Sequence, residues 1–236
     1  MKRFYKNADA AEHLGGYGVF LDGRPVRTPA KRDMVLPGVA LAKAIAEEWE
    51  AQAEKVDPAT MPMMRLAATA MDRVSPQRAH VVGEIAAYGG SDLLCYRAEY
   101  PEALIMRQAA CWDPLLSWCA ERFGARLAVT TGIVHIPQDE QALAALRDAV
   151  AACDDFTLSA LHTLVGVSGS LVIGLAVLHG RLKAREAFSV SQIDEDFQRE
   201  QWGEDKEAMA RRMHLLTSME EAERYLTLLA SAKGGV

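Results

Sequence analysis

The stretch at residues 17–28, YGVFLDGRPVRT, decides how the chain begins to fold. Two runs of strand-forming residues flank Asp22-Gly23, a dipeptide that favours a two-residue hairpin turn because both turn positions need a positive φ angle. Residues 34–36 can add a third strand. Because two or three strands are not stable alone in water, another element must cover one face of this sheet.

The segment that follows the hairpin predicts this cover. At residues 39–55, the side chains Leu41, Ile45, Trp49 and Ala53 recur at the spacing of a helix with one apolar face. We interpret Trp49 as the anchor of this helix on the hairpin, because it lies on the apolar stripe. The N-terminal part of the chain is therefore predicted to be a small unit of sheet and helix.

Beyond residue 62 the pattern is almost entirely helical, and Ser75-Pro76 looks like an N-cap followed by proline in the first helical turn. We place the domain boundary there. The sequence thus predicts an α+β fold, with a small N-terminal α/β domain at residues 1–75 and a larger, mainly α-helical domain at residues 76–236. We expect a short hairpin at 126–137 and helices at 102–111, 114–123, 140–153, 157–178 and 192–232, the last broken near Trp202-Gly203.

The composition is that of a folded globular protein without a nucleic-acid partner. The 236 residues are 50% hydrophobic and 25% charged, with a net charge of −6, and no concentrated basic face is evident to bind phosphates. The four cysteines are too widely spaced for a zinc or dithiol motif and fit a reducing compartment. We therefore expect no metal or cofactor. No apolar signal core follows Met1, which predicts a cytoplasmic protein or an already mature chain.

One segment raises the question of a membrane. Residues 161–178, LHTLVGVSGSLVIGLAVL, have the length of a membrane span and contain no Asp, Glu, Lys or Arg. The segment also contains serines, a histidine and three glycines, which weaken its partition into a bilayer, and it lacks aromatic belts. We predict a helix buried in the core of the protein and no membrane insertion.

No catalytic arrangement is evident among the candidate residues. None of the six histidines has the spacing of a zinc-protease helix, and Ser168 lacks the context of a nucleophile elbow. One alternative stays open, a small-molecule enzyme with a carboxylate pair near Asp92 or Asp113, which would need a deep pocket and a carboxyl group with a raised pKa. A further alternative is a helical interaction module with some other client.

Two stretches are richer in aromatic and acidic residues than a helical core requires. Residues 91–118 include Asp92, Trp112 and Asp113, and we expect Asp113 to be an N-cap before the proline that follows it. Residues 194–205, DEDFQREQWGED, have the charge density of a solvated helix face. A large aromatic residue and a glycine within so acidic a run also suggest a kinked surface that grips a partner.

Together these stretches resemble the F1-ATPase assembly chaperones that act on the α subunit. The resemblance rests on LDGRPVRTPAKR at 21–32, LAKAIAEEWEAQ at 41–52, SDLLCYRAEYPEAL at 91–104 and DFQREQWGED at 196–205, in the same order along the chain. It implies the same two-domain fold, chaperoning instead of catalysis, and no bound nucleotide. The implied partner is the unassembled α subunit of the F1 sector of ATP synthase, held until the β subunit takes the chaperone's place.

The resemblance also implies functional positions. Trp49 falls on a tryptophan implicated in assembly through its role in the fold. An acidic residue implicated in function falls on Glu195, with Asp194 and Asp196 as neighbours that could be confused with it. The other positions expected on the partner-binding surface are Phe197, Gln198 and Trp202, and those expected to have a structural or functional role are Asp92, Trp112 and Asp113.

The chain departs from the mitochondrial members of this family in two respects. It has no evident presequence, so we expect a bacterial cytoplasmic protein, whereas the eukaryotic relatives act in the mitochondrial matrix. Glu204-Asp205-Lys206 follows the tryptophan–glycine pair, and the match to the family is less secure at these residues. We also expect a monomer.

Overall fold

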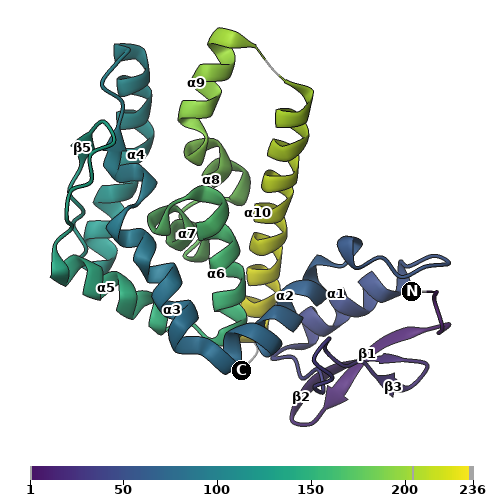
Figure 1. The fold of residues 1–236 in the computed structure, drawn as a ribbon. Coiled ribbons are helices and arrows are strands. Elements are labelled where there is room, and N and C mark those ends of the chain that lie inside the picture. Colours follow the sequence, from purple (N-terminus) through teal and green to yellow (C-terminus); the bar gives the residue numbers. More distant parts are fainter. Residues whose placement is uncertain (1, 204, 234–236) are drawn as a thin grey trace. The chain divides into compact units, whose positions relative to one another are not determined.

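The computed structural model describes residues 2–203 and 205–233 of the chain, which is drawn as a ribbon in Figure 1. The chain forms two compact units. Unit 1 takes Met1–Arg78, Asp154–Ala160 and Arg224–Val236, and unit 2 takes Ala79–Cys153 and Leu161–Glu223. The domain boundary expected after residue 75 stays a prediction, because a compact unit need not be a domain that folds by itself.

Unit 1 contains the predicted hairpin. Strands β1 (Ala8–His13), β2 (Gly16–Leu21) and β3 (Arg24–Pro25) form an antiparallel sheet in the order β1-β2-β3. Asp22 and Gly23 turn the chain between β2 and β3 with φ angles of 47° and 79°. Both angles are positive, as a two-residue hairpin turn of this kind requires.

Two details of this sheet differ from the prediction. The sequence does not predict β1, because ADAAEH lacks β-branched and aromatic residues. Residues 34–36 do not form a separate strand. Instead Leu36 alone bridges to Tyr17, through N···O distances of 2.7 and 3.0 Å between their backbones. Pairing with the backbone of β2 thus holds β1 and Leu36 in the sheet, although β1 has a weak preference for strand.

Helix α1 (Val39–Glu50) lies against β1 and β2, as predicted (Figure 1). Leu41, Ile45 and Trp49 are buried on the face that meets the sheet. Ala53 is exposed and lies beyond the end of the helix. The apolar stripe is therefore one turn shorter than predicted.

The helical segment that follows does not start at Ser75. Helix α2 (Pro62–Thr69) continues through a π-helical turn (Ala70–Val74) and a 3-10 turn (Ser75–Gln77) into α3 (Arg78–Ala87). The backbone of Ser75 is helical, with φ −54° and ψ −46°, so the predicted N-cap is wrong. The wider π turn changes the hydrogen-bonding pattern directly before the proline, which therefore does not end the helical run.

Helix α4 (Glu102–Phe123) is continuous where two helices were expected. Pro114 lies inside it, and Asp113 is therefore not an N-cap. A proline inside a helix costs about 3 kcal/mol. The buried apolar face of α4, which includes Leu104 and Leu115, offsets that cost by keeping both halves of the helix packed on their neighbours.

The apolar segment at residues 161–178 forms two helices instead of one. Helix α6 (Asp155–Ser168) ends at Gly169, whose φ of 68° is left-handed, and α7 (Leu171–Leu178) begins at the N-cap Ser170. The side chain of Ser170 accepts a hydrogen bond from the backbone N–H of Ile173. Residues 171–177 are buried, as predicted for a core helix. No helix in the part of the chain that the structure describes is long and apolar enough to cross a membrane.

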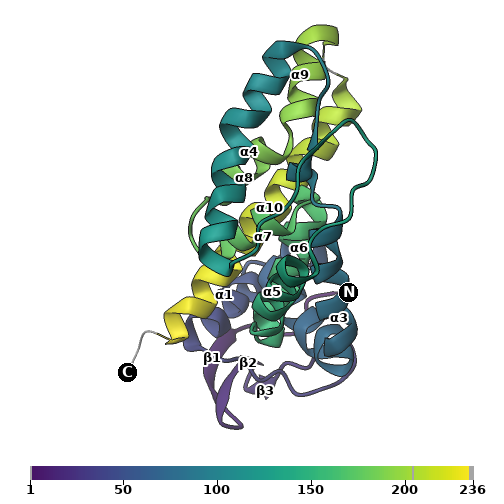
Figure 2. The same cartoon turned by 90° about the vertical axis from the view of Figure 1, so that its left-hand side faces the viewer.

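The remaining elements lie mostly in unit 2. They include a parallel pair of short strands, so the predicted hairpin at residues 126–137 is wrong: one strand at that position pairs with a strand before α4. Helices α4 and α9 lie side by side in both views (Figure 1, Figure 2). The elements are β4 (Tyr96–Arg97), β5 (Thr130–Thr131), α5 (Glu140–Ala151), α8 (Ala184–Ser191), α9 (Ile193–Trp202), α10 (Lys206–Lys233) and 3-10 turns at Pro58–Thr60, Tyr88–Gly90 and Leu93–Cys95.

Candidate functional site: a cleft between two C-terminal helices

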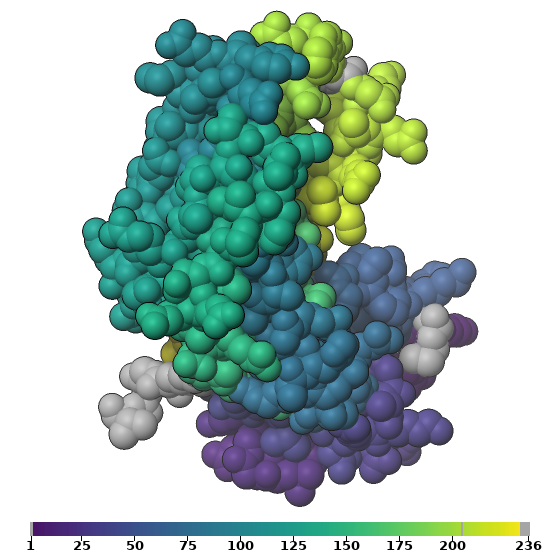
Figure 3. All heavy atoms as spheres, turned by 60° about the vertical axis from the view of Figure 1, so that its left-hand side comes forward, coloured from purple at the N-terminus to yellow at the C-terminus, as the bar shows by residue number. Residues whose placement is uncertain are grey.

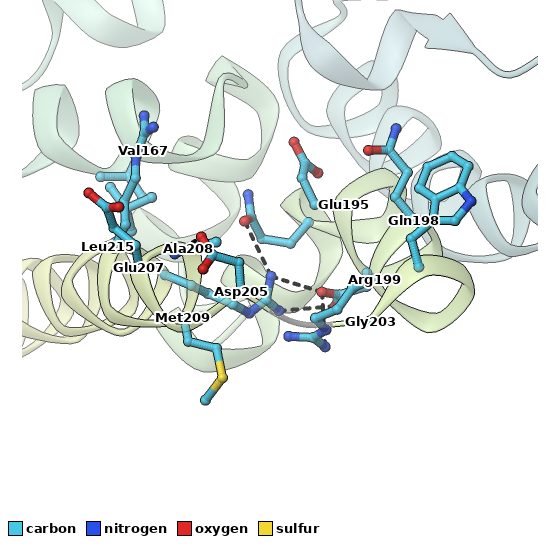
Figure 4. Close-up of a pocket in the computed structure, with 15 residues that line it drawn as sticks. Val167, Glu195, Gln198, Arg199, Gly203, Asp205, Glu207, Ala208, Met209 and Leu215 are labelled. Atoms are coloured by element: carbon cyan, nitrogen blue, oxygen red, sulfur yellow. Dashed lines mark hydrogen bonds and ion pairs between the residues drawn. The ribbon is translucent and has the colours of Figure 1, made fainter.

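A cleft of about 870 Å³ lies between α9 and the first half of α10, entirely within unit 2 (Figure 4). Figure 3 shows the corresponding opening between the yellow-green atoms of α9 and the yellower atoms of α10. Val167 of α6 also lines the cleft. The other lining residues are Gln192, Glu195, Asp196, Gln198, Arg199, Trp202, Gly203, Asp205, Glu207, Ala208, Met209, Arg211, Arg212 and Leu215.

The local sequence explains why the two walls of the cleft are separate helices. Three acidic residues occupy the first turn of α9, where the positive end of the helix dipole favours negative charge. Gly203, with a left-handed φ of 88°, ends α9. This confirms the predicted break near Trp202-Gly203. Glu204, part of the expected departure from the family pattern, lies outside the described residues.

The first acidic residue of α9, Asp194, is tied to α4. Its Oδ1 accepts a 2.6 Å hydrogen bond from Nε2 of Gln108. The other end of the Gln108 amide accepts a hydrogen bond from the backbone N–H of Ala98 at 2.8 Å. Since Gln108 is buried, Asp194 belongs to the packing of α9 on α4 and not to a free surface.

The third acidic residue, Asp196, is tied to α10. Its carboxylate lies 2.8 Å from the Arg212 guanidinium and 3.3 Å from that of Arg199. Arg212 also donates a hydrogen bond to the side chain of Gln192. Asp196 therefore joins α9 to α10 through its ion pair with Arg212, and its carboxylate also lies beside Arg199.

Only Glu195 among these three carboxylates is exposed and forms no ion pair within the described chain. In Figure 4 its side chain points away from the dashed ion pairs that join α9 to α10. The sequence could not separate Glu195 from its two neighbours, because consecutive helical residues differ only in the direction that they face. The packing of α9 between α4 and α10 makes this distinction.

The two aromatic residues of α9 differ in the same way. Phe197 is half-buried, and the Arg107 guanidinium lies over its ring at 5.5 Å from the centroid. Arg107 also binds both carboxylate oxygens of Glu200, at 2.8 and 2.9 Å. The Arg107 hydrogen bonds hold the pKa of the exposed Glu200 carboxyl below its ordinary value. Phe197 thus takes part in a second link between α4 and α9.

Trp202, by contrast, is 81% exposed at the end of α9 and lines the cleft. Gln198, one turn before it, is also exposed and lines the cleft. Across the cleft, α10 presents the partly exposed Met209, and Met213 follows one turn later with 57% exposure. Exposed large apolar side chains gathered at one place are typical of a protein-binding surface.

Trp49 lies in a different environment, the core of unit 1. It is only 8% exposed, and its ring meets that of Tyr5 edge to face, with 5.6 Å between centroids. The Tyr5 hydroxyl donates a 2.6 Å hydrogen bond to the Trp49 carbonyl. The indole Nε1 is buried and has no hydrogen-bond partner. This geometry supports the interpretation of Trp49 as an anchor of α1 on the sheet.

Asp92 is fully buried and connects two segments of unit 2. Its carboxylate accepts hydrogen bonds from the Ser170 hydroxyl at 2.7 Å, from Val172 N at 3.0 Å and from Leu94 N at 3.1 Å. Burial raises the pKa of this carboxyl, and the hydrogen bonds oppose that shift. The pKa of the Asp92 carboxyl is therefore unusual. Both of its oxygens, however, already accept hydrogen bonds from the start of α7 and from the turn after Asp92.

Asp113 and Trp112 share a different partner, Arg97. The Arg97 guanidinium lies 2.7 Å from the Asp113 carboxylate and 5.2 Å from the centroid of the Trp112 ring. Trp112 is fully buried and donates its indole N–H to the Val190 carbonyl at 2.9 Å. Asp92 and Asp113 therefore have separate sets of partners and separate structural roles.

Two of the cysteines, Cys95 and Cys119, are buried and lack the properties of a reactive site. All four are free, and burial raises the pKa of the Cys95 and Cys119 thiols to about 12. A thiol with so high a pKa is protonated at neutral pH and is a poor nucleophile. Among the described residues, no three His, Cys, Asp or Glu side chains gather in a way that could hold a metal ion.

The fold and the cleft define a class of protein: a mainly helical protein with a small N-terminal sheet and a cleft between its C-terminal helices. The model of the ATP12 chaperone protein family matches residues 2–120, about half of the chain, and the chain belongs to this family. The cleft lies beyond the matched segment. It is covered by the comparisons with whole chains.

Three relatives extend the match along the chain. A curated relative, the mitochondrial protein atp12 of Schizosaccharomyces pombe, is 23% identical over 214 residues, which cover 86% of this chain and 74% of the relative. The crystal structure of Atp12 from Paracoccus denitrificans superposes with a TM-score of 0.94 at 47% identity, over 97% of this chain and 98% of that chain. An aspartate-to-lysine mutant of the Paracoccus protein superposes with the same TM-score at 46% identity, over 97% of each chain.

These matches confirm the predicted family, the α+β fold class and the predicted class of function. The protein is a chaperone of the assembly of the F1 sector of ATP synthase, and its family is one of chaperones, not of enzymes. The alternative of a small-molecule enzyme built on Asp92 or Asp113 is therefore set aside. Of the positions expected on the partner-binding surface, Glu195, Asp196, Gln198 and Trp202 line the cleft, whereas Asp194 and Phe197 do not. The contribution of α10 was missed, since its lining residues carry no local signal.

Proposed function

We propose that this chaperone binds the unassembled α subunit of F1 through the cleft between α9 and α10, and that it yields the α subunit to the β subunit. One observation carries the choice of surface. Among the residues that the structure describes, Glu195 is the acid in the first turn of α9 that forms no hydrogen bond or ion pair with α4 or α10, and it shares the cleft with the exposed Trp202.

The physical basis is the need to cover an interface before its partner arrives. A subunit taken from a hexamer exposes apolar surface, and such a surface promotes aggregation. A chaperone with moderate affinity covers this surface and is then displaced by a subunit with a larger and more complementary interface. Trp202 and Met209 supply apolar contact, and Glu195 supplies charge that steers and orients the client.

The test is capture of purified, unassembled α subunit by the chaperone, repeated with added β subunit. We expect binding that the β subunit displaces. Glu195→Lys should abolish capture while the melting temperature stays within a few degrees of wild type. Glu121→Lys makes the same charge change at an exposed position of α4 outside the cleft and should bind normally. Loss of binding in both variants, or unfolding of Glu195→Lys, would contradict the assignment of the surface.

Three further expectations belong to the same proposal. The chaperone acts as a monomer in the bacterial cytoplasm, with a domain of residues 1–75 that supports the helical part of the chain. The mass in light scattering should equal that of one chain, 25.8 kDa, at working concentrations. A stable dimer would contradict the monomer, and fractionation of cells would test the compartment.

A further inference from the structure

The chemistry of the cleft also indicates what kind of client segment it accepts. The geometry points to an amphipathic helix of the client that carries lysine or arginine beside its apolar face. This inference rests on the proposed function, since it specifies the part of the α subunit that would enter the cleft. Three observations carry it: the backbone of the walls, the apolar side chains and the uncompensated charges.

The walls of the cleft favour a helix over an extended segment. Most lining residues belong to α6, α9 or α10, and backbone N–H and C=O groups inside a helix already bond to each other. An extended peptide would therefore bury backbone groups without backbone partners, which is costly. A helix satisfies its own backbone and needs only side-chain contacts, as in other helix-in-groove complexes.

The apolar side chains suit a helical partner. The cleft is lined by apolar side chains from three helices: Trp202 of α9, Met209 and Leu215 of α10, and Val167 of α6. Met213 extends the exposed apolar stripe of α10 by one turn. Methionine side chains are unbranched and adapt to the shape of a partner, so a groove of this kind accepts the apolar face of an amphipathic helix.

The charges of the cleft determine which charge the client helix should carry beside its apolar face. Asp196 lies between Arg199 and Arg212, and its one negative charge offsets one of their two positive charges. Glu195, Asp205 and Glu207 line the cleft and form no ion pair with any residue that the structure describes. Arg211, which also lines the cleft, likewise forms no ion pair with a residue that the structure describes. The four lining carboxylates exceed the three lining arginines by one, so the net charge of the lining is negative, and a basic helix complements it.

The inference is tested with three synthetic peptides that share one apolar face. The first is a helix with lysines beside that face, the second has glutamates in their place, and the third is the lysine peptide interrupted by prolines that prevent a helix. Binding to the full-length chaperone is measured by fluorescence of labelled peptide. We expect the lysine helix to bind, and the other two peptides to bind about tenfold more weakly or not at all.

A matched pair of chaperone variants locates the binding. The combined variant Glu195→Gln, Asp205→Asn, Glu207→Gln removes three charges from the cleft. The control Glu121→Gln, Glu140→Gln, Asp148→Asn removes three charges from exposed positions of unit 2 outside it. Only the first should weaken binding of the lysine helix, by about tenfold.

Binding of the α subunit, measured on the same preparations, separates this inference from the proposed function. If the α subunit binds but the three peptides bind equally, or the two variants behave alike, the basic helix is wrong and the proposed function stands. If the lysine helix binds in the cleft but the α subunit does not, the proposed function is wrong. Competition between the lysine helix and the α subunit would support both.

Discussion

Trp49 and Trp202 are the same residue type in two regions with opposite environments. Trp49 is 8% exposed in the core of unit 1, and Trp202 is 81% exposed beside the cleft of unit 2. The local sequence already indicates the difference, because Trp49 lies on an apolar stripe of helical spacing and Trp202 lies in an acidic run. The difference is that the sheet of unit 1 covers one ring, whereas no described element covers the other. A buried tryptophan stabilises a fold, and an exposed one is available to a partner.

The acidic residues show the same contrast. Asp92 is enclosed and fully hydrogen-bonded, whereas Glu195 is open to solvent and unpaired among the described residues. An assembly chaperone needs both kinds of region. A rigid interior fixes the positions of the helices, and a surface left incomplete in the free protein is completed by the client.

The largest effect is expected from the buried tryptophan. Trp49→Ala removes a large core side chain and should lower the free energy of unfolding by about 3–5 kcal/mol, a large share of the stability of a typical protein. Trp49→Phe should cost much less, because the indole N–H has no hydrogen-bond partner to lose. Urea denaturation followed by circular dichroism measures both. Wild-type stability of Trp49→Ala would show that the ring does not anchor α1.

The buried carboxylate should give the next largest loss. Asp92→Ala leaves the Ser170 hydroxyl and the Val172 N–H without their acceptor, and we expect a loss of about 3 kcal/mol. Asp92→Asn should also destabilise, since an amide NH₂ group replaces one of the two acceptor oxygens. Glu195→Gln is the matched change at the exposed acid and should leave the urea midpoint unchanged. If Asp92→Asn and Glu195→Gln lowered the free energy of unfolding equally, the two carboxylates would not differ in their structural role.

The exposed tryptophan should affect binding and not stability. Trp202→Ala is expected to weaken capture of the α subunit by about 2 kcal/mol, roughly thirtyfold, while thermal unfolding stays as in wild type. Tyr100→Ala removes another exposed aromatic ring of unit 2, 79% accessible and outside the cleft, and should bind like wild type. A titration of labelled α subunit measures all three proteins. If Tyr100→Ala and Trp202→Ala lost affinity equally, the cleft would not be the specific surface.

The smallest effect concerns the ion pair that joins α9 to α4. Because Arg107 lowers the folded-state pKa of Glu200, the pair stabilises the fold above the ordinary glutamate pKa of about 4.3. This contribution is lost as the pH falls through the lowered folded-state pKa. Since the pair is exposed, the change is small. The melting temperatures of wild type and Glu200→Gln should therefore differ slightly near neutral pH and converge in acid; a gap that widened in acid would contradict the assigned sign.

The parts of the fold that local chemistry dictates were predictable. The Asp22-Gly23 turn needs two positive φ angles, and the spacing of Leu41, Ile45 and Trp49 fits a helix with one apolar face. Both depend on residues that are close in sequence. The family resemblance, carried by several motifs in order, then led to the class of function, which the comparisons confirm.

The errors share one physical cause, since each concerns a preference that distant packing overrides. Ser75 is a good N-cap by type but lies inside a helical run, and Pro114 lies inside α4 because the buried face on both sides keeps that helix intact. Strand β1 has weak strand-forming residues and is held by its pairing with β2. The register and partners of such segments depend on residues far along the chain.

The sequence by itself determined the hairpin, the first helix, the break after Trp202 and the acidic character of α9. It could not determine which of three consecutive acids stays open to solvent, because all three have the same chemistry and the same local context. The tertiary structure decided this by placing Gln108 of α4 beside Asp194 and Arg212 of α10 beside Asp196. Glu195 was left unpaired because consecutive side chains on a helix point in different directions, and only the neighbours of the helix fix which direction is open.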